Sequence, residues 1–234
     1  MPAAGNEVAA RMTTEQTVER LVDATIKLLA DKGPSEIKAR SVAEAAQVST
    51  IAMYYHLGGL RELLQAVVDK GFRELERAFE AIPPSDDPVD DLFAIALTCR
   101  RLAQDNPHLY DLMFGLSTRG TYRPLQDSTA DATRRSLAFQ AAYSHLVRAC
   151  GRLVHSGRIR VDEDPEIVAT QLWSCLHGFV TLELGGHFSH IPDTVDRILQ
   201  AMTVNVLVGL GDTAERAKAS HVRAITRLAQ PDRL

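Results

Sequence analysis

The sequence predicts an all-α fold, in which a three-helix helix-turn-helix unit is followed by a helical bundle. Along most of the chain, apolar residues recur three or four positions apart, which is the period of an amphipathic helix. Ser, Thr, Asp, Gly and Pro stand at the ends of these periodic segments, where helix caps and stops are expected. No run of alternating β-branched residues suggests a strand.

The composition is that of an ordinary globular chain. It has 234 residues, 45% hydrophobic and 24% charged, with a formal net charge of −4. A chain of this charge is not a general polyanion binder, so any contact with nucleic acid must come from a local patch. Cys99, Cys150 and Cys175 lie in apolar helical patterns without metal-ligand spacing, which favours a reducing, cytoplasmic location. No apolar run is long enough to suggest a membrane span.

The N-terminal part should form four helices, preceded by a disordered arm at 1–13 that lacks the apolar core of a signal peptide. We expect helices at 14–31, 39–46, 50–56 and 60–81. Thr14 and Ser49 can cap the first and third of these. Gly33-Pro34 and Gly58-Gly59 interrupt the pattern. Residues 14–59 therefore form the helix-turn-helix unit, and 60–81 form a long connecting helix.

The second part of the chain begins after IPPSDDP, residues 82–88, which is the clearest boundary. Further helices are expected at 89–104, 106–114, 126–155, 164–188 and 192–210, with an irregular segment at 115–124. Asp164-Pro165 supplies an N-cap and a first-turn proline. These helices make up a second domain at 88–211. Residues 212–234 are assigned to a polar tail with helical propensity.

The second and third helices are joined by a turn of a few residues at Gln47-Val48, which is the helix-turn-helix arrangement. Ala43 and Ala46 are small, so the two helices can cross closely. Val48 can fill the apolar centre, and Ser49 can cap the third helix and reach a phosphate. Such a third helix enters the major groove of DNA with its N-terminal residues towards the base edges.

The segment SVAEAAQVSTIAMYYHL, residues 41–57, resembles the DNA-binding domain of the TetR family, and the resemblance extends over residues 14–71. It implies an all-helical dimer that represses transcription from palindromic operators. It also implies that a small molecule entering the C-terminal domain releases the DNA. We therefore expect a DNA-binding domain followed by a ligand-binding and dimerisation domain, with double-stranded operator DNA as the partner.

The resemblance also implies which side chains meet DNA. Ser49, Thr50 and Ala52 stand where the recognition helix starts, and Tyr54, Tyr55 and His56 stand at its phosphate-contacting end. Arg40 stands where it can hold a phosphate. The full expected set is Lys38, Arg40, Ser41, Ser49, Thr50, Ile51, Ala52, Tyr54, Tyr55, His56 and Arg61.

Three departures from the family pattern weaken this interface. Gln47 replaces the usual turn glycine, and a left-handed conformation there costs a non-glycine residue roughly 1 kcal/mol. Leu60 replaces a lysine, which removes a phosphate contact for which Arg61 can compensate. The patch is weakly basic because Glu44 offsets Lys38, Arg40 and Arg61. We expect weaker, less salt-sensitive DNA binding than is usual in the family.

Two further segments, residues 106–115 and 172–183, resemble a C-terminal subgroup of the family marked by a Trp, a His and a Gly on one helix, the WHG-type domain. Trp173 and His177 share a helix face, and Gly178 permits a close helix approach. The expected ligand-binding set is Phe72, Phe93, Arg100, Tyr110, Met113, Phe114, Phe139, Tyr143, Trp173 and His177, with His145 as a further polar candidate. The alternative is that His177 is a core or interface histidine and that most of the aromatic set is core.

The resemblance places the homodimer interface on the helices at 164–188 and 192–210. The second of these carries apolar residues on several faces, among them Ile198, Met202, Val206 and Leu210, which favours an interface over an exposed surface. A dimer is also needed because one recognition helix covers too few base pairs for specificity.

The sequence contains few features of a metal site or of an enzyme active site. His187-x-x-His190 lies near Glu183, but the segment looks like a fraying helix end and no third ligand is defined, so no metal site and no cofactor is assigned. Hydrolase and phosphate-loop motifs are missing, so no enzymatic activity is expected. Two alternatives to an effector-released repressor remain open. One is a constitutive DNA-binding regulator without an effector, and the other is a helical small-molecule-binding protein with a vestigial helix-turn-helix.

Overall fold

The computed structural model describes residues 13–114 and 136–229, and within them it contains helices and no strand. This confirms the predicted all-α class. The elements are α1 (Thr14–Lys32), η1 (Pro34–Glu36), α2 (Ala39–Ala45), α3 (Thr50–Leu57), α4 (Leu60–Glu80), α5 (Pro88–Asp105), α6 (Pro107–Met113), α7 (Leu137–His155), α8 (Pro165–Leu184), η2 (Val195–Gln200), α9 (Ala201–Gly209) and α10 (Ala214–Leu228). The expected disordered arm at 1–13, apart from Thr13, lies outside the described residues, as do the irregular segment at 115–124 and the helix start at 126–135.

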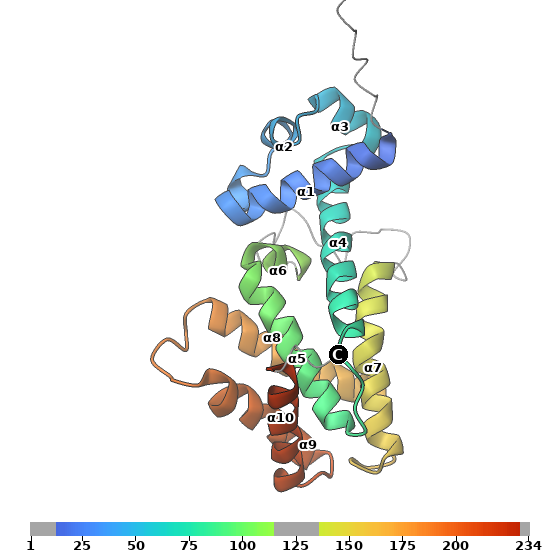
Figure 1. Cartoon of the computed structure of the whole chain (residues 1–234), viewed down its shortest axis with the longest axis vertical. Helices are drawn as coiled ribbons and strands as arrows, with labels where there is room; N and C mark the ends of the chain where they lie inside the picture. Colours follow the sequence, from blue (N-terminus) through green and yellow to red (C-terminus); the bar gives the residue numbers. More distant parts are fainter. Residues whose placement is uncertain (1–12, 115–135, 230–234) are drawn as a thin grey trace, which may run out of the picture.

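The N-terminal helices α1, α2 and α3 pack together above the start of α4 (Figure 1). Leu21, Val42 and Met53, one from each of the three helices, are fully buried at their centre. Thr13, rather than Thr14, caps α1: its hydroxyl accepts from the N–H of Gln16, and the Gln16 side chain accepts from the N–H of Thr13. This reciprocal capping box satisfies two backbone donors that a helix start otherwise leaves unpaired.

Helix α4 connects the helix-turn-helix to the rest of the molecule and packs along α7 (Figure 1). Its buried residues follow the helical period and include Leu63, Val67, Phe72, Leu75 and Phe79. Gly71 belongs to the same face. A Cβ at that position would lie 2.6 Å from Sδ of Met113, so the glycine is what allows α6 to approach α4.

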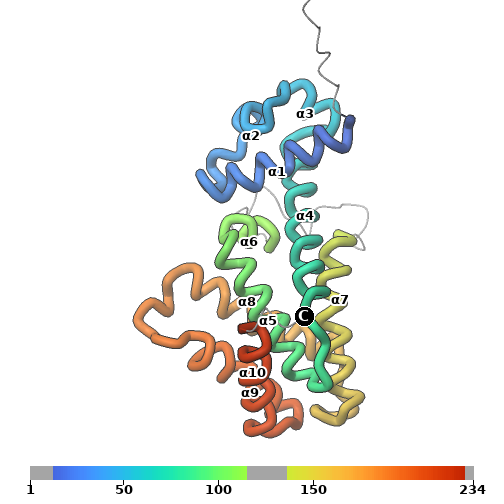
Figure 2. The backbone as a smooth tube through the Cα atoms, viewed as in Figure 1, coloured from blue at the N-terminus to red at the C-terminus, as the bar shows by residue number. Residues whose placement is uncertain are grey.

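The segment assigned to a polar tail is instead the helix α10, which packs against α5 and α9. The smooth trace in Figure 2 shows it within the C-terminal bundle, beside α9. Its buried face consists of small or polar residues, namely Ala217, Ser220, His221 and Ala224. The helix at 192–210 is therefore not the last helix of the described residues, and the C-terminal bundle extends beyond residue 211.

A network of charged groups holds α10 in place. Arg158 is buried and donates to Asp212 at 2.7 Å and to Asp87 at 2.7 Å. Arg227 donates to Asp90 at 2.6 Å. Because buried charges are tolerated only when they are paired, this network compensates for the weak apolar character of the α10 face.

Two predicted helix boundaries differ from the structure. The helix expected at 164–188 ends at Leu184, before Gly185-Gly186, and the one expected at 192–210 begins after Asp193, a non-glycine residue with a φ of 52°. The first six residues of the latter, Val195–Gln200, are π-helical. Among the described helices, none has the length and apolar character needed to cross a membrane.

Candidate nucleic-acid interface and aromatic cluster

The turn between α2 and α3 is closed by backbone hydrogen bonds around Gln47. The N–H of Val48 donates to the carbonyl of Ala43 at 2.9 Å, and the N–H of Gln47 donates to Glu44 at 3.0 Å, which is a Schellman motif. Gln47 has a φ of 57°, the left-handed conformation expected at this position. Its side-chain oxygen accepts a hydrogen bond from Arg20 at 2.6 Å, so the residue that strains the turn also ties it to α1.

Helix α3 is short, capped and largely exposed. The hydroxyl oxygen of Ser49 accepts from the N–H of Ala52 at 3.0 Å, as predicted, and its own proton stays available to a further acceptor. Only Met53 is fully buried. Ile51, Tyr54 and Tyr55 are 79%, 54% and 83% exposed, so three large side chains of one helix face solvent. Such a cluster is typical of surfaces that contact a partner.

The remaining residues of the expected DNA-binding set lie on the same end of the molecule. Lys38, Arg40, Thr50 and Arg61 are exposed, whereas Ser41, Ala52 and His56 are half-buried. Figure 1 shows α2 and α3 at the end of the molecule farthest from α9 and α10. Lys38 lies 3.8 Å from Glu36, which partly offsets its charge. This surface is only weakly basic, as the sequence indicates.

His56 and the two glycines that follow it form the junction between α3 and α4. Nδ1 of His56 is buried without a hydrogen-bond partner among the described residues, and Tyr55 packs against the His56 ring at 5.0 Å. Gly58 has a φ of 88° and Gly59 a φ of 157°, conformations that other residues rarely adopt. Helix α4 therefore begins almost immediately after α3 ends, and the two helices are joined without a flexible linker.

A second feature is an aromatic cluster formed by residues of α4, α6, α7 and α8. Trp173 and His177 lie 4.1 Å apart between ring centroids, and Phe114 lies 4.2 Å from His177. Tyr143 lies 5.5 Å from Trp173. The complete aromatic cluster is Phe72, Tyr110, Phe114, Phe139, Tyr143, Trp173 and His177. The structure thus brings together most of the residues that the sequence assigned to a ligand pocket.

His177 is the polar centre of the aromatic cluster. Its Nδ1 is hydrogen-bonded to the hydroxyl of Tyr110, and its Nε2 is buried without a partner among the described residues. Burial lowers the pKa of His177 to about 3, so the imidazole is neutral at physiological pH. In a neutral imidazole one ring nitrogen donates and the other accepts, so the direction of the bond to Tyr110 decides whether Nε2 is a donor or an acceptor. The cluster therefore contains one buried polar atom that has no partner among the described residues.

The other predicted ligand residues lie outside the aromatic cluster. The guanidinium of Arg100 pairs with both carboxylate oxygens of Glu183, at 2.7 and 2.9 Å. Met113 packs against Gly71, and His145 packs beside Phe79 on the α4–α7 contact. Phe93 stacks on His221, with ring centroids 3.9 Å apart. His221 was missed from the sequence because its neighbours on the buried face of α10 are small or polar residues, which do not predict burial.

Phe93 and His221 line a small apolar cavity between α5, α8, α9 and α10, with Trp173 on its wall. Its volume is about 30 Å³. One water requires roughly 10–15 Å³ of such volume, so the cavity is far too small for a metabolite. Nδ1 of His221 is buried without a partner among the described residues, and burial lowers the pKa of His221 to about 4.

Helices α8 and α9 pack against each other and expose apolar residues. Ile167 and Leu182 on α8 and Val208 on α9 are all exposed. Gly178 is also exposed, and a Cβ built on it meets no atom within 4 Å. Gly178 would allow another helix to approach closely, but no helix of the described residues packs against it.

Two family models match the sequence. Residues 21–67 match the model described as bacterial regulatory proteins, tetR family. Residues 92–206 match the model described as the tetracyclin repressor-like C-terminal domain. The first match covers the helix-turn-helix from within α1 to the first turns of α4, and the second runs from within α5 to within α9.

Curated relatives are regulators from mycobacteria. The HTH-type transcriptional regulator Rv1816 of Mycobacterium tuberculosis is 27% identical over 159 residues, covering 66% of this chain and 64% of the relative. Rv1255c of the same organism, described as an uncharacterized HTH-type transcriptional regulator, is 28% identical over 107 residues, covering 45% and 53%. The chain thus spans between about half and two thirds of the length of these relatives.

Solved structures share the fold at low sequence identity. A protein of unknown function from Rhodococcus sp. RHA1 has a TM-score of 0.70 at 22% identity, covering 88% of this chain and all of the other. RolR in complex with resorcinol has a TM-score of 0.61 at 19% identity, covering 90% and 95%. CprB of S. coelicolor A3(2), a TetR family protein, has a TM-score of 0.58 at 18% identity, covering 91% and 97%.

Proposed function

Because the chain belongs to the TetR family of transcriptional regulators, we propose that it is a repressor that binds a palindromic operator as a homodimer and is released by a small hydrophobic effector. The observation that carries this proposal is the exposed face of α3, with Ile51, Tyr54 and Tyr55 in solvent at the far end of the molecule. Under the proposal, residues 14–59 bind DNA, α4 connects, and the helices from α5 onwards, α10 included, form the regulatory domain.

DNA recognition by this face divides into two kinds of contact. Thr50, Ile51 and Ala52 are in the first turn of α3, which is the part of a recognition helix that reaches base edges. Tyr54, Tyr55 and His56 follow in its last turns, where hydroxyl and imidazole groups contact phosphates and fix the register. Ser49, Ser41 and the cations Lys38, Arg40 and Arg61 add further phosphate contacts.

Dimerisation is supported by the exposed apolar residues of α8 and α9. Exposure of Ile167, Leu182 and Val208 to water is unfavourable, and burial of these side chains against a second copy would stabilise a dimer. Gly178 permits close backbone approach on the same helix. A two-fold dimer places two copies of α3 at half-sites one or more helical turns apart, which provides the specificity that one helix lacks.

The effector site is proposed at the aromatic cluster. Rings from four helices provide an apolar, stackable surface, and Nε2 of His177 provides one buried polar atom without a partner among the described residues. Sites for small molecules typically combine these two features. We therefore propose an effector that is mainly apolar or aromatic and carries one polar group that hydrogen-bonds to Nε2. RolR, of similar fold, was solved with resorcinol.

The experiment that tests the proposal is an electrophoretic mobility shift with the purified full chain and the DNA upstream of its own gene. A specific, competitor-resistant shift at low salt is expected, with a complex that contains two chains. If no specific complex forms with any upstream fragment, the chain is not a DNA-binding regulator. The vestigial helix-turn-helix alternative would then hold.

Effector release is tested separately by thermal-shift screening with small aromatic and hydrophobic metabolites. A compound that stabilises the chain should also dissociate the DNA complex, and His177→Leu should weaken both effects. A chain that binds DNA specifically but is stabilised by no compound would be a constitutive regulator.

A further inference from the structure

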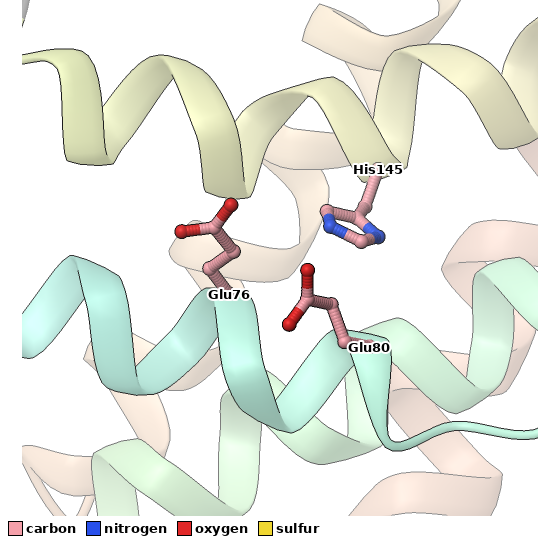
Figure 3. A group of neighbouring side chains, drawn as sticks. All are labelled: Glu76, Glu80 and His145. Carbon is pink, nitrogen blue, oxygen red and sulfur yellow. The ribbon is translucent and has the colours of Figure 1, made fainter.

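Three side chains with metal-ligand chemistry converge where α4 packs on α7 (Figure 3). Glu76 and Glu80 are one helical turn apart on α4 and point towards α7, where His145 faces them. One ligand atom from each of the three lies within 4.8 Å of the others. His145 is remote from both glutamates in the sequence, so this convergence is a product of the fold.

Neither carboxylate has a cationic partner. Glu76 and Glu80 make no ion pair and no side-chain hydrogen bond that the structure shows within residues 13–114 and 136–229. Arg148, one turn beyond His145, is exposed and forms no ion pair with them. Two neighbouring carboxylates repel each other, and a bound cation removes that repulsion.

The protein framework holds the three groups in position. Phe79 lies between Glu76 and Glu80 in the sequence, and its side chain is buried. Its ring packs against that of His145, with centroids 6.0 Å apart. Helices α4 and α7 make an extensive contact along their length. The ligand atoms of a tetrahedral zinc ion lie about 2.0–2.2 Å from the metal and hence about 3.3–3.6 Å from each other, so side-chain movements that shorten the separations by up to about 1.5 Å close the site.

We propose that Glu76, Glu80 and His145 bind one divalent transition-metal ion of the zinc class, with water completing the coordination shell. An imidazole together with carboxylates suits zinc, nickel or cobalt, whereas magnesium and calcium prefer oxygen ligands alone. The ion would bridge α4 and α7 near the end of α4 that is distant from α3. Its binding would therefore stabilise the packing of these two helices.

The test is calorimetric titration of Zn²⁺ into the full chain in a non-chelating buffer with a non-thiol reductant. One ion per chain is expected, with a Kd in the micromolar range or tighter and no comparable binding of Mg²⁺. Glu80→Gln and His145→Gln should each weaken Zn²⁺ binding at least tenfold. Hydrogen exchange in residues 73–81 should slow on Zn²⁺ addition to the wild type and stay unchanged in Glu80→Gln.

Two control variants separate this site from other ligands. Glu74→Gln removes the same charge from α4 outside the cluster and should leave Zn²⁺ affinity unchanged, and so should His187→Gln. Circular dichroism melts would show that each variant is folded. The proposal is overturned if the wild type binds no Zn²⁺ below about 100 µM, a threshold near 5.5 kcal/mol of binding free energy. It is equally overturned if His187→Gln abolishes binding while Glu80→Gln and His145→Gln retain it.

Discussion

The hydroxyl of Tyr110 is hydrogen-bonded to Nδ1 of His177, and the opposite ring nitrogen is buried without a partner among the described residues. This hydrogen bond holds the His177 ring in one orientation within the aromatic cluster. Leaving a buried polar atom unpaired costs about 1–3 kcal/mol. Under the proposed function, a ligand group that hydrogen-bonds to Nε2 removes this cost. The same atom would then lower the stability of the free protein and contribute to ligand binding.

Stability should fall as the solution is acidified, because His177 and His221 are neutral in the folded state. Their folded pKa values are about 3 and about 4, against 6.5 for an ordinary histidine. Between pH 6.5 and these values the unfolded chain binds protons that the folded chain does not, so stability is lost as pH falls through this window. At pH 5 each histidine lowers the free energy of unfolding by up to about 2 kcal/mol relative to pH 8. Urea unfolding at the two pH values measures this.

The matched variants His177→Gln and His221→Gln should each reduce the difference between pH 8 and pH 5. His190→Gln, at an exposed site, should leave it unchanged. A double variant His177→Gln/His221→Gln with the full wild-type pH dependence would show that carboxylates, not these histidines, control acid stability.

The two groups of side chains on α3 should differ in their effect on DNA binding. Tyr54→Phe removes one phosphate-directed hydroxyl and should weaken all sites alike, by about 2- to 10-fold for a hydrogen bond of 0.5–1.5 kcal/mol. Thr50→Ala and Ala52→Ser should change the ranking of operator variants instead. Quantitative mobility shifts on a panel of operators distinguish these outcomes. Uniform weakening by Thr50→Ala would contradict the proposed role of the first turn.

The salt dependence of DNA binding should be shallow for a family member. In a dimer, the two copies of Lys38, Arg40 and Arg61 provide six cations. Each phosphate that a cation neutralises contributes about −0.9 to the slope of log K against log salt concentration. The slope should therefore be no steeper than roughly −5. Affinities measured across a range of salt concentrations give this slope. A much steeper value would mean that cations outside this patch contact the DNA.

Replacing Gly71 should destabilise the packing of α6 on α4. The added methyl of Gly71→Ala would lie 2.6 Å from Sδ of the buried Met113, and overpacking of this kind typically costs about 1–3 kcal/mol. Gly151, in the interior of α7, has no atom within 4 Å of an added Cβ. Gly151→Ala should therefore stabilise by about 0.5–1 kcal/mol through helix propensity alone. Urea unfolding of both variants compares the two effects, and stabilisation by both would contradict the close contact.

Gln47 should couple energetically to Arg20. Gln47→Gly relieves about 1 kcal/mol of left-handed strain but also removes the hydrogen bond between the two side chains. The substitution should therefore stabilise more in an Arg20→Ala background than in the wild type, by about 0.5–1.5 kcal/mol. A double-mutant cycle on the free energy of unfolding measures this coupling. Equal effects in both backgrounds would exclude it.

Short-range chemistry explains which parts of the fold the sequence predicts. The Ser49 cap, the left-handed Gln47 and the Gly58-Gly59 break each depend on residues within a few positions, so the helix-turn-helix follows directly from the sequence. The packing of Trp173 and His177 against Phe114 and Tyr143 also matches expectation, because helical spacing places them on faces that meet. Phe93, an aromatic of the same kind, lies elsewhere because no local signal shows which neighbour its helix face contacts.

The helical propensity of the segment that forms α10 follows from the sequence, but its packing into the bundle does not. Its buried face is Ala217, Ser220, His221 and Ala224, residues too small or too polar to predict burial. The groups that hold it, Asp87 and Arg158 among them, come from distant segments and meet only in the folded state. The same is true of His145 facing Glu76 and Glu80.

The direct junction of α3 and α4 has a mechanical consequence. Helix α4 has 21 residues, so at 1.5 Å per residue it is about 31 Å long. Suppose that α4 pivots about its C-terminal end, which packs against α7. A tilt of about 10° then displaces the N-terminus of α4 by about 5 Å, which exceeds the 3.4 Å rise of one base pair. Because only Gly58 and Gly59 separate α3 from α4, α3 must move with the N-terminus of α4. A tilt of about 10° around the aromatic cluster is then enough to put the two recognition helices of the proposed dimer out of phase with the DNA helix.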